Sequence, residues 1–419
     1  MTKIRTKLAL TAAMCVVMAG CDRLPLAQTG DKTADMAIAY MAKDDPAGAQ
    51  RASHLPDPMN DPAVQYYAAY PKLKRILSMD NGMSREVEGE GCTAATPAAD
   101  PALSRFAPVV LAMSDKDAEG LMVKSANAGF VKAQTAIGML IDHGVVPDGV
   151  DGDDVSALAW MTKAAKAGDV DAEYQLGQYY EHGRYADQDG TQATVWYAKA
   201  ADQGDRRAMV DLADLDMTGT AVPRDTTRAI ELYQQAAAKD EPSAEATLGG
   251  IYYDGKMVPQ DYAQAARYYQ QAANHCNHVA QFRLGYLYQT GQGVARDDGK
   301  AADLYSKSAK WQRNAAYNLG VMYQKGQGVS QDDAKAAEYF QMGADRGDWS
   351  SQAALAGMLE AGKGIDKDPA KAKTLYCQAA KSGDLGSRVA CERLAATLTV
   401  QGVFTGGASS AASSATSME

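Results

Sequence analysis

Apolar and small residues recur along most of this chain at intervals of about thirty-six residues. Each unit centres on a leucine or isoleucine that is followed by a small residue, with an alanine four residues before it and usually a tyrosine four residues after it. Because positions i, i+4 and i+8 share one side of an α-helix, this spacing predicts a helix with one apolar face. The central residues are Ile137, Leu176, Leu212, Leu248, Leu284, Leu319 and Leu355, at intervals of 39, 36, 36, 36, 35 and 36 residues.

A glycine-containing turn and a second helix follow in each unit. The turn reads Gly-x-Gly-Val in its fullest form, at residues 291–294 and 326–329, and glycine tolerates the positive φ that such a turn needs. Aspartates recur three residues after the Val or Ile, where a carboxylate can cap the second helix. These aspartates are Asp225, Asp261, Asp297, Asp332 and Asp368. The second helix is closed at a left-handed C-cap position by Gly168, Gly204, Gly347 and Gly383.

The repeated glycine turn is best interpreted as a joint in an array of stacked helical hairpins. Glycine loops that bind phosphate follow a β-strand and precede a helix. Here the loop lies between two predicted helices and returns, in degenerate form, in almost every unit. We therefore expect no nucleotide or other cofactor at these turns.

The chain resembles the Sel1-like repeat family, relatives of the tetratricopeptide repeats, through the pattern A-x-x-x-L-G-x-x-Y…G-x-G-V-x-x-D-x-x-K-A-x-x-x-Y-x-x-A-A-x-x-G. The resemblance covers residues 133–383 in seven units, and residues 115–129 resemble the second helix of an eighth. It implies an all-α fold, an α/α solenoid of about seven helix-turn-helix repeats. Departures from the pattern are Asp216 at the first-helix tyrosine, Ala221 at the second turn glycine and Cys276 at a closing glycine.

The predicted solenoid occupies residues 104–400 and ends in a capping helix at 387–400, since the last apolar face of an array needs a cover. Residues 401–419 are rich in Gly, Ser and Ala and are expected to be disordered. Residues 34–103 contain short predicted helices at 34–42 and at 63–79, the latter with a break near Pro71. The pattern does not predict how this N-terminal region folds.

The first twenty residues have the features of an export signal. Lys3, Arg5 and Lys7 precede an apolar run at 8–18 that is too short to span a bilayer. The run ends in Met-Ala-Gly-Cys, which resembles the lipobox of bacterial lipoproteins with Met18 where the family more often carries Leu. The resemblance implies cleavage after residue 20, a lipid on Cys21 and a tether at 21–33. An ordinary signal peptide that is cut elsewhere is the alternative.

The same resemblance predicts where the protein resides. A lipid on Cys21 would anchor the chain to a membrane on the periplasmic side. Asp22 follows the cysteine, and in enteric-type bacteria an aspartate there favours the inner membrane; the outer membrane stays an alternative.

Charge excludes one class of partner. The chain has 42 Lys and Arg against 52 Asp and Glu; without residues 1–20 the balance is 39 against 52, a net charge of −13. Contacts to phosphate need Lys or Arg to displace counterions, so nucleic acid is not expected as a partner.

The cysteines and histidines provide few candidates for chemistry. Cys377 and Cys391 lie seven residues on either side of Asp384, so in an antiparallel helix pair they can face each other and form a disulfide; two buried free thiols are the alternative. Cys92 could pair with Cys276 by elimination. We interpret the segment Asn274–His278, with His275, Cys276 and His278, and the acidic stretch 148–154 as solvated loops rather than zinc or calcium sites. We therefore expect no bound metal.

The predicted function is binding of another protein. Positions one before and three after the central residue point away from the apolar face and form pairs that could line the concave side of the solenoid. The pairs are Gln175 with Tyr179, Asp211 with Leu215, Thr247 with Ile251, Arg283 with Leu287, and Asn318 with Met322. Alternatively, the apolar member of each pair seals one repeat against the next.

We therefore expect a non-catalytic, membrane-anchored periplasmic scaffold. The family resemblance also implies a narrower role, that of an immunity protein which neutralises a secreted phospholipase-type toxin. No nucleophile motif supports the alternative from another class, an envelope enzyme such as a cell-wall hydrolase or a β-lactam-binding protein.

Overall fold

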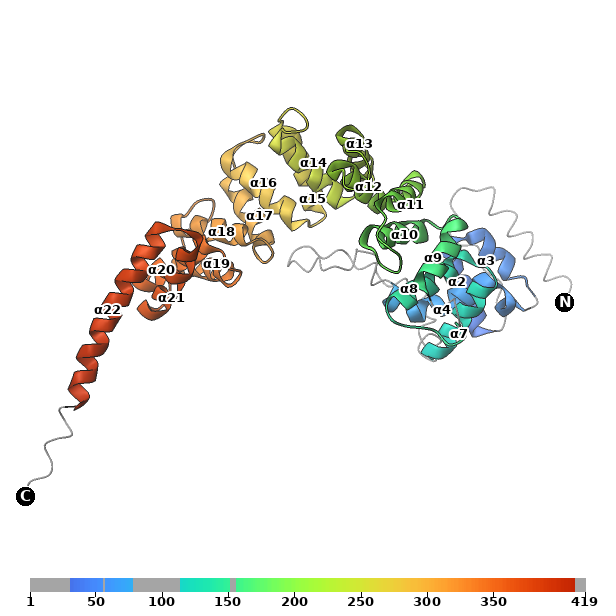
Figure 1. Cartoon of the computed structure of the whole chain (residues 1–419), viewed down its shortest axis with the longest axis horizontal. Helices are drawn as coiled ribbons and strands as arrows, with labels where there is room; N and C mark the ends of the chain where they lie inside the picture. The colour runs from blue at the N-terminus through green and yellow to red at the C-terminus, as the bar shows by residue number, and fades with distance from the viewer. Residues whose placement is uncertain (1–30, 56, 78–113, 151–155, 411–419) are drawn as a thin grey trace, which may run out of the picture. The chain divides into compact units, whose positions relative to one another are not determined.

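The computed structural model describes residues 31–55, 57–77, 114–150 and 156–410, and within these ranges it contains helices and no strand. The predicted all-α fold is therefore confirmed. The chain divides into two compact units whose boundary follows Arg224, inside the repeat that carries Asp216 and Ala221. Figure 1 labels the helices, and each unit is described by itself.

The described helices of unit 1 are α2 (Lys32–Asp44), α3 (Pro46–Ala52), α4 (Pro62–Leu77), α7 (Asp115–Asn127), α8 (Val131–Asp142), α9 (Ala157–Lys166), α10 (Val170–His182), α11 (Gly190–Asp202) and α12 (Arg206–Thr218), with a short 3-10 helix at Pro58–Asn60. Those of unit 2 are α13 (Thr226–Ala237), α14 (Pro242–Asp254), α15 (Tyr262–Asn274), α16 (His278–Thr290), α17 (Asp298–Ala309), α18 (Arg313–Lys325), α19 (Asp333–Asp345), α20 (Trp349–Ala361), α21 (Pro369–Ala379) and α22 (Leu385–Ser410), with a 3-10 turn at Ala380–Ser382.

In unit 1 the helices that precede the repeats join the core of the first repeats. Helix α4 packs on both α2 and α7, and Ile38 and Tyr67 are buried in one apolar cluster with Ile137 and Leu140. The expected helix at 34–42 is confirmed by α2. The break expected at Pro71 is wrong, because α4 continues through it; packing against two helices outweighs the one hydrogen bond that a proline removes.

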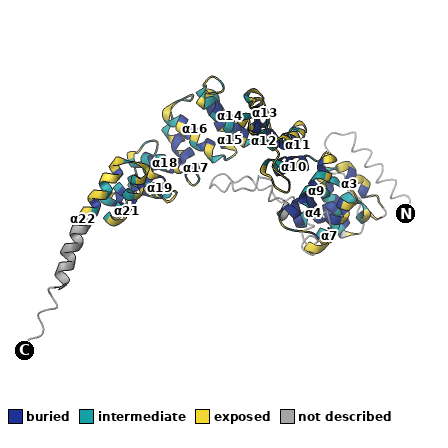
Figure 2. Ribbon diagram, in the orientation of Figure 1, coloured by how far each residue is buried: buried dark blue, intermediate teal, exposed yellow. Residues whose placement is uncertain are grey.

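The repeats are hairpins in which a first helix packs on a second, as α10 does on α11, α14 on α15, α16 on α17 and α18 on α19. Consecutive first helices also contact each other in unit 2, where α14 touches α16 and α18 touches α20. Buried residues gather where helices face one another, and exposed residues lie on the outer sides and in the turns (Figure 2).

The small residue after the central leucine makes room for an aromatic ring of the second helix. A Cβ on Gly285 would stand 2.9 Å from a ring carbon of Tyr305, which is fully buried. The same arrangement places Tyr197 over Gly177, Tyr269 over Gly249, and Phe340 over Gly320. Close packing of these rings is therefore the physical reason for the Leu-Gly pair.

The turns and caps follow the predicted chemistry. All five predicted aspartates cap second helices; the side chain of Asp297, for example, accepts a hydrogen bond from the Lys300 backbone N–H at 2.9 Å. The second turn glycine is needed at Gly293, where φ is +70° and an added Cβ would collide with the backbone of Tyr262. Tyr185 occupies the equivalent position in an earlier repeat with φ +62°.

The final helix α22 caps the array but is longer than predicted. It extends to Ser410, ten residues into the segment that was expected to be disordered from residue 401, and no proline interrupts it there. Residues 1–30 lie outside the described ranges, so the signal peptide, the tether and Cys21 stay predictions. Among the described helices, none has the length and apolar character to cross a membrane.

Candidate partner-binding surface

Each predicted pair has a residue one position before the central leucine and a residue three positions after it; we call these two sets the polar row and the apolar row. The apolar row was predicted to line a binding groove, but it lies in the core. Tyr179, Leu215, Ile251, Leu287 and Met322 are all buried, with at most 8 % of each residue exposed. These five residues have no surface to offer a partner, so the alternative prediction, a seal, fits the structure. The reason is angular: a residue three positions after the central leucine lies only about 60° from it around the helix, on the packed side.

The residues of the polar row have a different environment. They lie near the hydroxyl groups of buried tyrosines on the second helices. Tyr305 donates a hydrogen bond to Gln289 Oε1 at 2.9 Å, and Asn318 hydrogen-bonds the same hydroxyl and partly offsets the rise in its pKa that burial causes. Burial raises the pKa of Tyr269 to about 12, and the nearby Arg283 opposes that rise. On α19 the second-helix tyrosine is replaced by Phe340, which has no hydroxyl, and the equivalent first-helix position on α20 carries the apolar Ala354.

The members of this row differ in exposure. Gln175 is buried, Asp211, Thr247 and Asn318 are half-buried, and Arg283 is exposed. Satisfying a buried hydroxyl is a structural role, and Asn318 performs it. Arg283 is the one member of the polar row that both reaches a buried tyrosine and remains accessible to a partner.

The exposed side of the first helices is shifted by one residue from the predicted side, which used the positions one before and three after the central leucine. Residues two before and two after the central leucine lie roughly opposite it on the helix. In unit 2 this side carries Phe282 and Tyr286 on α16 and Tyr317 on α18, with Tyr286 exposed and the other two half-buried. Val279 and Trp349 extend it with exposed fractions of 43 % and 52 %. We call Val279, Phe282, Arg283, Tyr286, Tyr317 and Trp349 the aromatic face.

The sequence contained the signal for the aromatic face. Rotating the helical wheel by one residue would have placed Tyr286 opposite Leu284. Aromatic residues and arginine are enriched in the centres of protein interfaces.

In unit 1 the corresponding side carries charged groups around one tyrosine. Arg207 donates to Asp171 Oδ1 and to Asp205 Oδ2, each at 2.6 Å, and its guanidinium lies 4.4 Å from the ring centre of Tyr174. Burial, together with Glu181, Asp214 and Asp205 nearby, raises the pKa of Asp211 to about 7, although a hydrogen bond from Tyr174 opposes the rise. This carboxyl group therefore holds its proton to near-neutral pH.

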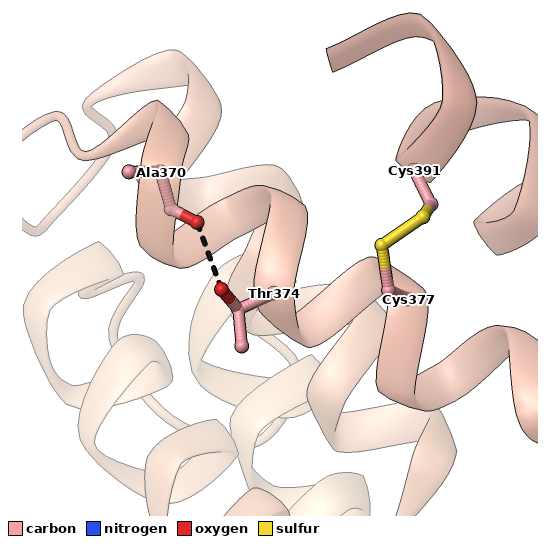
Figure 3. The surroundings of a disulfide bond; sticks show 4 residues. All are labelled: Ala370, Thr374, Cys377 and Cys391. Carbon is pink, nitrogen blue, oxygen red and sulfur yellow. Dashed lines mark hydrogen bonds between the residues drawn. A yellow bond between two sulfur atoms is a disulfide. The ribbon is translucent and has the colours of Figure 1, made fainter. Parts of the chain in front are cut away.

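The cysteines of the cap are joined. A disulfide links Cys377 on α21 to Cys391 on α22, with 5.1 Å between their Cα atoms (Figure 3). Cys276 is also disulfide-bonded. Cys92 lies outside the described residues, so its pairing with Cys276 stays a prediction.

The three side chains of the histidine-rich segment have different surroundings, and the expectation that no metal binds here stays a prediction. Cys276 is oxidised, and the His278 ring stacks on Trp311 with 5.8 Å between ring centres. His275 instead approaches Glu245 and Asp240, with their ligand atoms within 4.8 Å of one another. Of the acidic stretch, Asp148 pairs with Lys116 at 3.2 Å, and residues 151–155 lie outside the described ranges.

The contact between His275 and Glu245 has a non-metal counterpart elsewhere in the array. The Nε2 of His275 lies 4.0 Å from Oε1 of the buried Glu245. In the repeat of α10 and α11 the equivalent pair is Gln203 and Glu173, which are joined by a direct hydrogen bond of 2.7 Å. We therefore interpret the His275 contact as a repeated structural link between a first helix and the end of its second helix.

Comparison with known proteins gives the same reading of the repeats. A family model described as the Sel1 repeat matches residues 131–169, 170–205, 206–241, 242–275, 278–310, 313–348 and 349–384. A search of curated proteins finds no significant match.

Two solved structures are similar over most of the array. A protective antigen present in uropathogenic Escherichia coli strains is 31% identical with a TM-score of 0.62, and the match covers 66% of this chain and 59% of the antigen, less than two thirds of its length. A Sel1 repeat protein from Oxalobacter formigenes is 26% identical with a TM-score of 0.51, over 60% of this chain and 99% of that one.

Proposed function

This chain belongs to the Sel1 repeat family, and from that membership we propose that it is a non-catalytic scaffold which binds a partner polypeptide along the aromatic face. The Sel1 repeat fold is typical of protein–protein interaction scaffolds. A solenoid of helical hairpins offers one continuous row of first helices, which suits an extended partner.

The observation that carries the proposal is the composition of the aromatic face. Tyr286, Val279 and Trp349 are at least 36% exposed, although the same chain buries the tyrosines of its second helices almost completely. Exposed apolar side chains cost hydration free energy unless a partner covers them. Tyr286 on α16 and Trp349 on α20 belong to different repeats, which supports a partner that spans more than one repeat.

The proposal includes a location. We propose that a lipid on Cys21 anchors the protein on the periplasmic side of the inner membrane, with the outer membrane as the alternative. The basic start, the short apolar run and the Gly-Cys junction support this. Metabolic labelling with an alkyne fatty acid should label the wild-type chain and leave Cys21→Ala unlabelled; equal labelling of both would contradict the anchor.

A narrower form of the proposal is an immunity role, with a secreted phospholipase-type toxin as the partner. The net charge of −13 that remains without residues 1–20 would complement a basic toxin surface. Co-expression with the product of a neighbouring toxin gene tests it. Protection of the host cell supports the role, and the lack of a stable complex would count against it.

Site-specific photocrosslinking tests the proposed surface. Benzoylphenylalanine replaces Tyr286 on the first helix α16 or, as the matched control, exposed Gln271 on the second helix α15. In the native envelope we expect a discrete crosslinked partner from position 286 and none from position 271. Crosslinking from position 271 alone would place the partner on the other side. Acylation of the chain by a labelled β-lactam would favour the enzyme alternative instead.

A further inference from the structure

Arg283 occupies an unusual position at the centre of the aromatic face. Its guanidinium carbon lies 5.8 Å from the ring centre of Tyr253 on α14 and 5.9 Å from that of Phe282 on its own helix. One ring of the preceding first helix and one ring of its own helix therefore flank the side chain, although the residue is exposed. An arginine held by aromatic rings keeps its charge and its N–H donors available, while it has less side-chain freedom to lose on binding.

The charge of Arg283 is not neutralised within the described part of the chain. Two exposed arginines of the same unit have a carboxylate partner, since Arg296 pairs with Asp298 at 2.8 Å and Arg393 with Glu360 at 2.7 Å, whereas Arg267 has a neighbouring ring and no such ion pair among the described residues. Arg283 has no ion pair of this kind within the described ranges. Asp254 is close enough to raise the pKa of Tyr253 but does not form an ion pair with Arg283.

The groups around Arg283 suit a polypeptide rather than a bare anion. Tyr286 lies one helical turn further along α16 and is 36% exposed. Beyond it, the half-buried amide side chains of Gln289 and Asn318, which hydrogen-bond the buried Tyr305 hydroxyl, add polar groups on α16 and α18. The surface therefore places one cation beside apolar rings and amide groups, a combination that fits an apolar segment with an acidic group.

We propose that Arg283 binds a carboxylate of the partner, carried by a segment whose apolar side chains cover Phe282 and Tyr286. The proposal rests on the function proposed above and adds the chemistry of the partner. Two planar N–H donors match the two oxygens of a carboxylate, so the contact selects for Asp, Glu or a C-terminus over a neutral or basic group. Since the chain as a whole is acidic, with 52 acidic against 42 basic residues, its long-range field gives an acidic segment no advantage. A preference for acid must then arise from local contact.

Fluorescence anisotropy with the full chain tests this. The probes are short labelled peptides of alanine, leucine and serine that carry glutamate, glutamine or lysine at the same positions, each with an amidated C-terminus. A further glutamine peptide has a free C-terminus, which separates a terminal carboxylate from a side-chain one. We expect a peptide with a carboxylate to bind at least about tenfold more tightly than the amidated glutamine peptide, which corresponds to about 1.4 kcal/mol.

The matched control is Arg267 on the second helix α15, which is also exposed and lies 5.2 Å from the ring centre of Tyr268. Arg283→Gln should abolish the preference for acid, whereas Arg267→Gln should leave it unchanged. An equal loss in both variants, tighter binding of the lysine peptide, or no binding of any carboxylate peptide would overturn the inference. Neutral peptides that bind without acid preference and are lost in Tyr286→Ala would overturn it while leaving the scaffold function intact.

Discussion

The two adjacent glycines of α14, Gly249 and Gly250, should respond to alanine in opposite ways. An added Cβ on Gly249 would lie 2.6 Å and 2.7 Å from two ring carbons of Tyr269, which is buried. On Gly250 the nearest atom would be the Tyr269 hydroxyl oxygen at 3.7 Å, an ordinary contact. The two substitutions add the same methyl group to the same helix.

The expected magnitudes follow from two effects. Replacing glycine by alanine in a helix favours folding by about 0.8–1.0 kcal/mol at either site. Forcing a methyl group into the packed ring of Tyr269 costs about 1–3 kcal/mol, since a stiff aromatic side chain cannot move aside without repacking its neighbours. Gly250→Ala should therefore raise the free energy of unfolding by up to about 1 kcal/mol, while Gly249→Ala should lie about 1–3 kcal/mol below it.

Urea titration followed by circular dichroism measures the difference, because the intrinsic helix preference cancels between the two variants. Gly249→Ala combined with Tyr269→Leu should recover part of the loss, since the obstructing ring is gone. Equal unfolding midpoints for Gly249→Ala and Gly250→Ala would refute the argument that the Leu-Gly pair exists to admit the second-helix ring.

Three further predictions concern the acidic cluster, the turns and the cap. Burial raises the pKa of the Asp211 carboxyl to about 7 in the folded protein, well above the range usual for aspartate. The unfolded chain therefore releases this proton at lower pH than the folded chain, so the free energy of unfolding falls as the pH rises from about 4 to 7. By linkage the loss is about 1–2 kcal/mol after allowance for partial exposure. Asp211→Asn should therefore make the urea unfolding midpoint depend less on pH between about pH 5 and pH 8 than it does in the wild type. An unchanged pH dependence in this variant would contradict the assignment. Gly293→Ala should lower the free energy of unfolding by about 2 kcal/mol or more, because the residue has a positive φ and the added methyl group would collide with the backbone of Tyr262. The loss should exceed that of Gly291→Ala, where the nearest atom would be 3.4 Å away. Comparable thermal midpoints of the two variants would argue against the turn geometry. Cys377→Ser with Cys391→Ser opens a link between residues 14 apart and should cost about 2–4 kcal/mol, seen as faster hydrogen exchange in α22, whereas unchanged exchange there would mean that the disulfide does not hold the cap.

Much of the fold could be predicted from the sequence because the repeat makes local chemistry visible. The aspartate caps, exemplified by Asp297, and the turn glycines depend on a few neighbouring residues, so their spacing alone predicts them. Pro71 shows the limit of this reasoning. Its local preference to end a helix is overridden by packing of α4 on α2 and α7, which no local pattern contains.

The candidate surface was predicted less well, for a related reason. A helical wheel drawn for one hairpin does not include the preceding repeat, whose Ala265 and Tyr269 share an apolar cluster with Leu287. The role of Asn318 also depends on a partner from another helix, the Tyr305 hydroxyl. Arg283 was predicted correctly as an exposed first-helix residue, although the rings that hold it come partly from α14, the preceding first helix.

The affinity of the crosslinked partner for the purified full chain tests the central claim most directly. Binding is compared for wild type, for Tyr286→Ala on the first helix and for Gln271→Ala on the second. If the aromatic face binds the partner, Tyr286→Ala should weaken binding by about tenfold or more, as expected for an aromatic residue at the centre of an interface, and Gln271→Ala should not change it. A full-strength complex with Tyr286→Ala, or a loss confined to Gln271→Ala, would contradict the account.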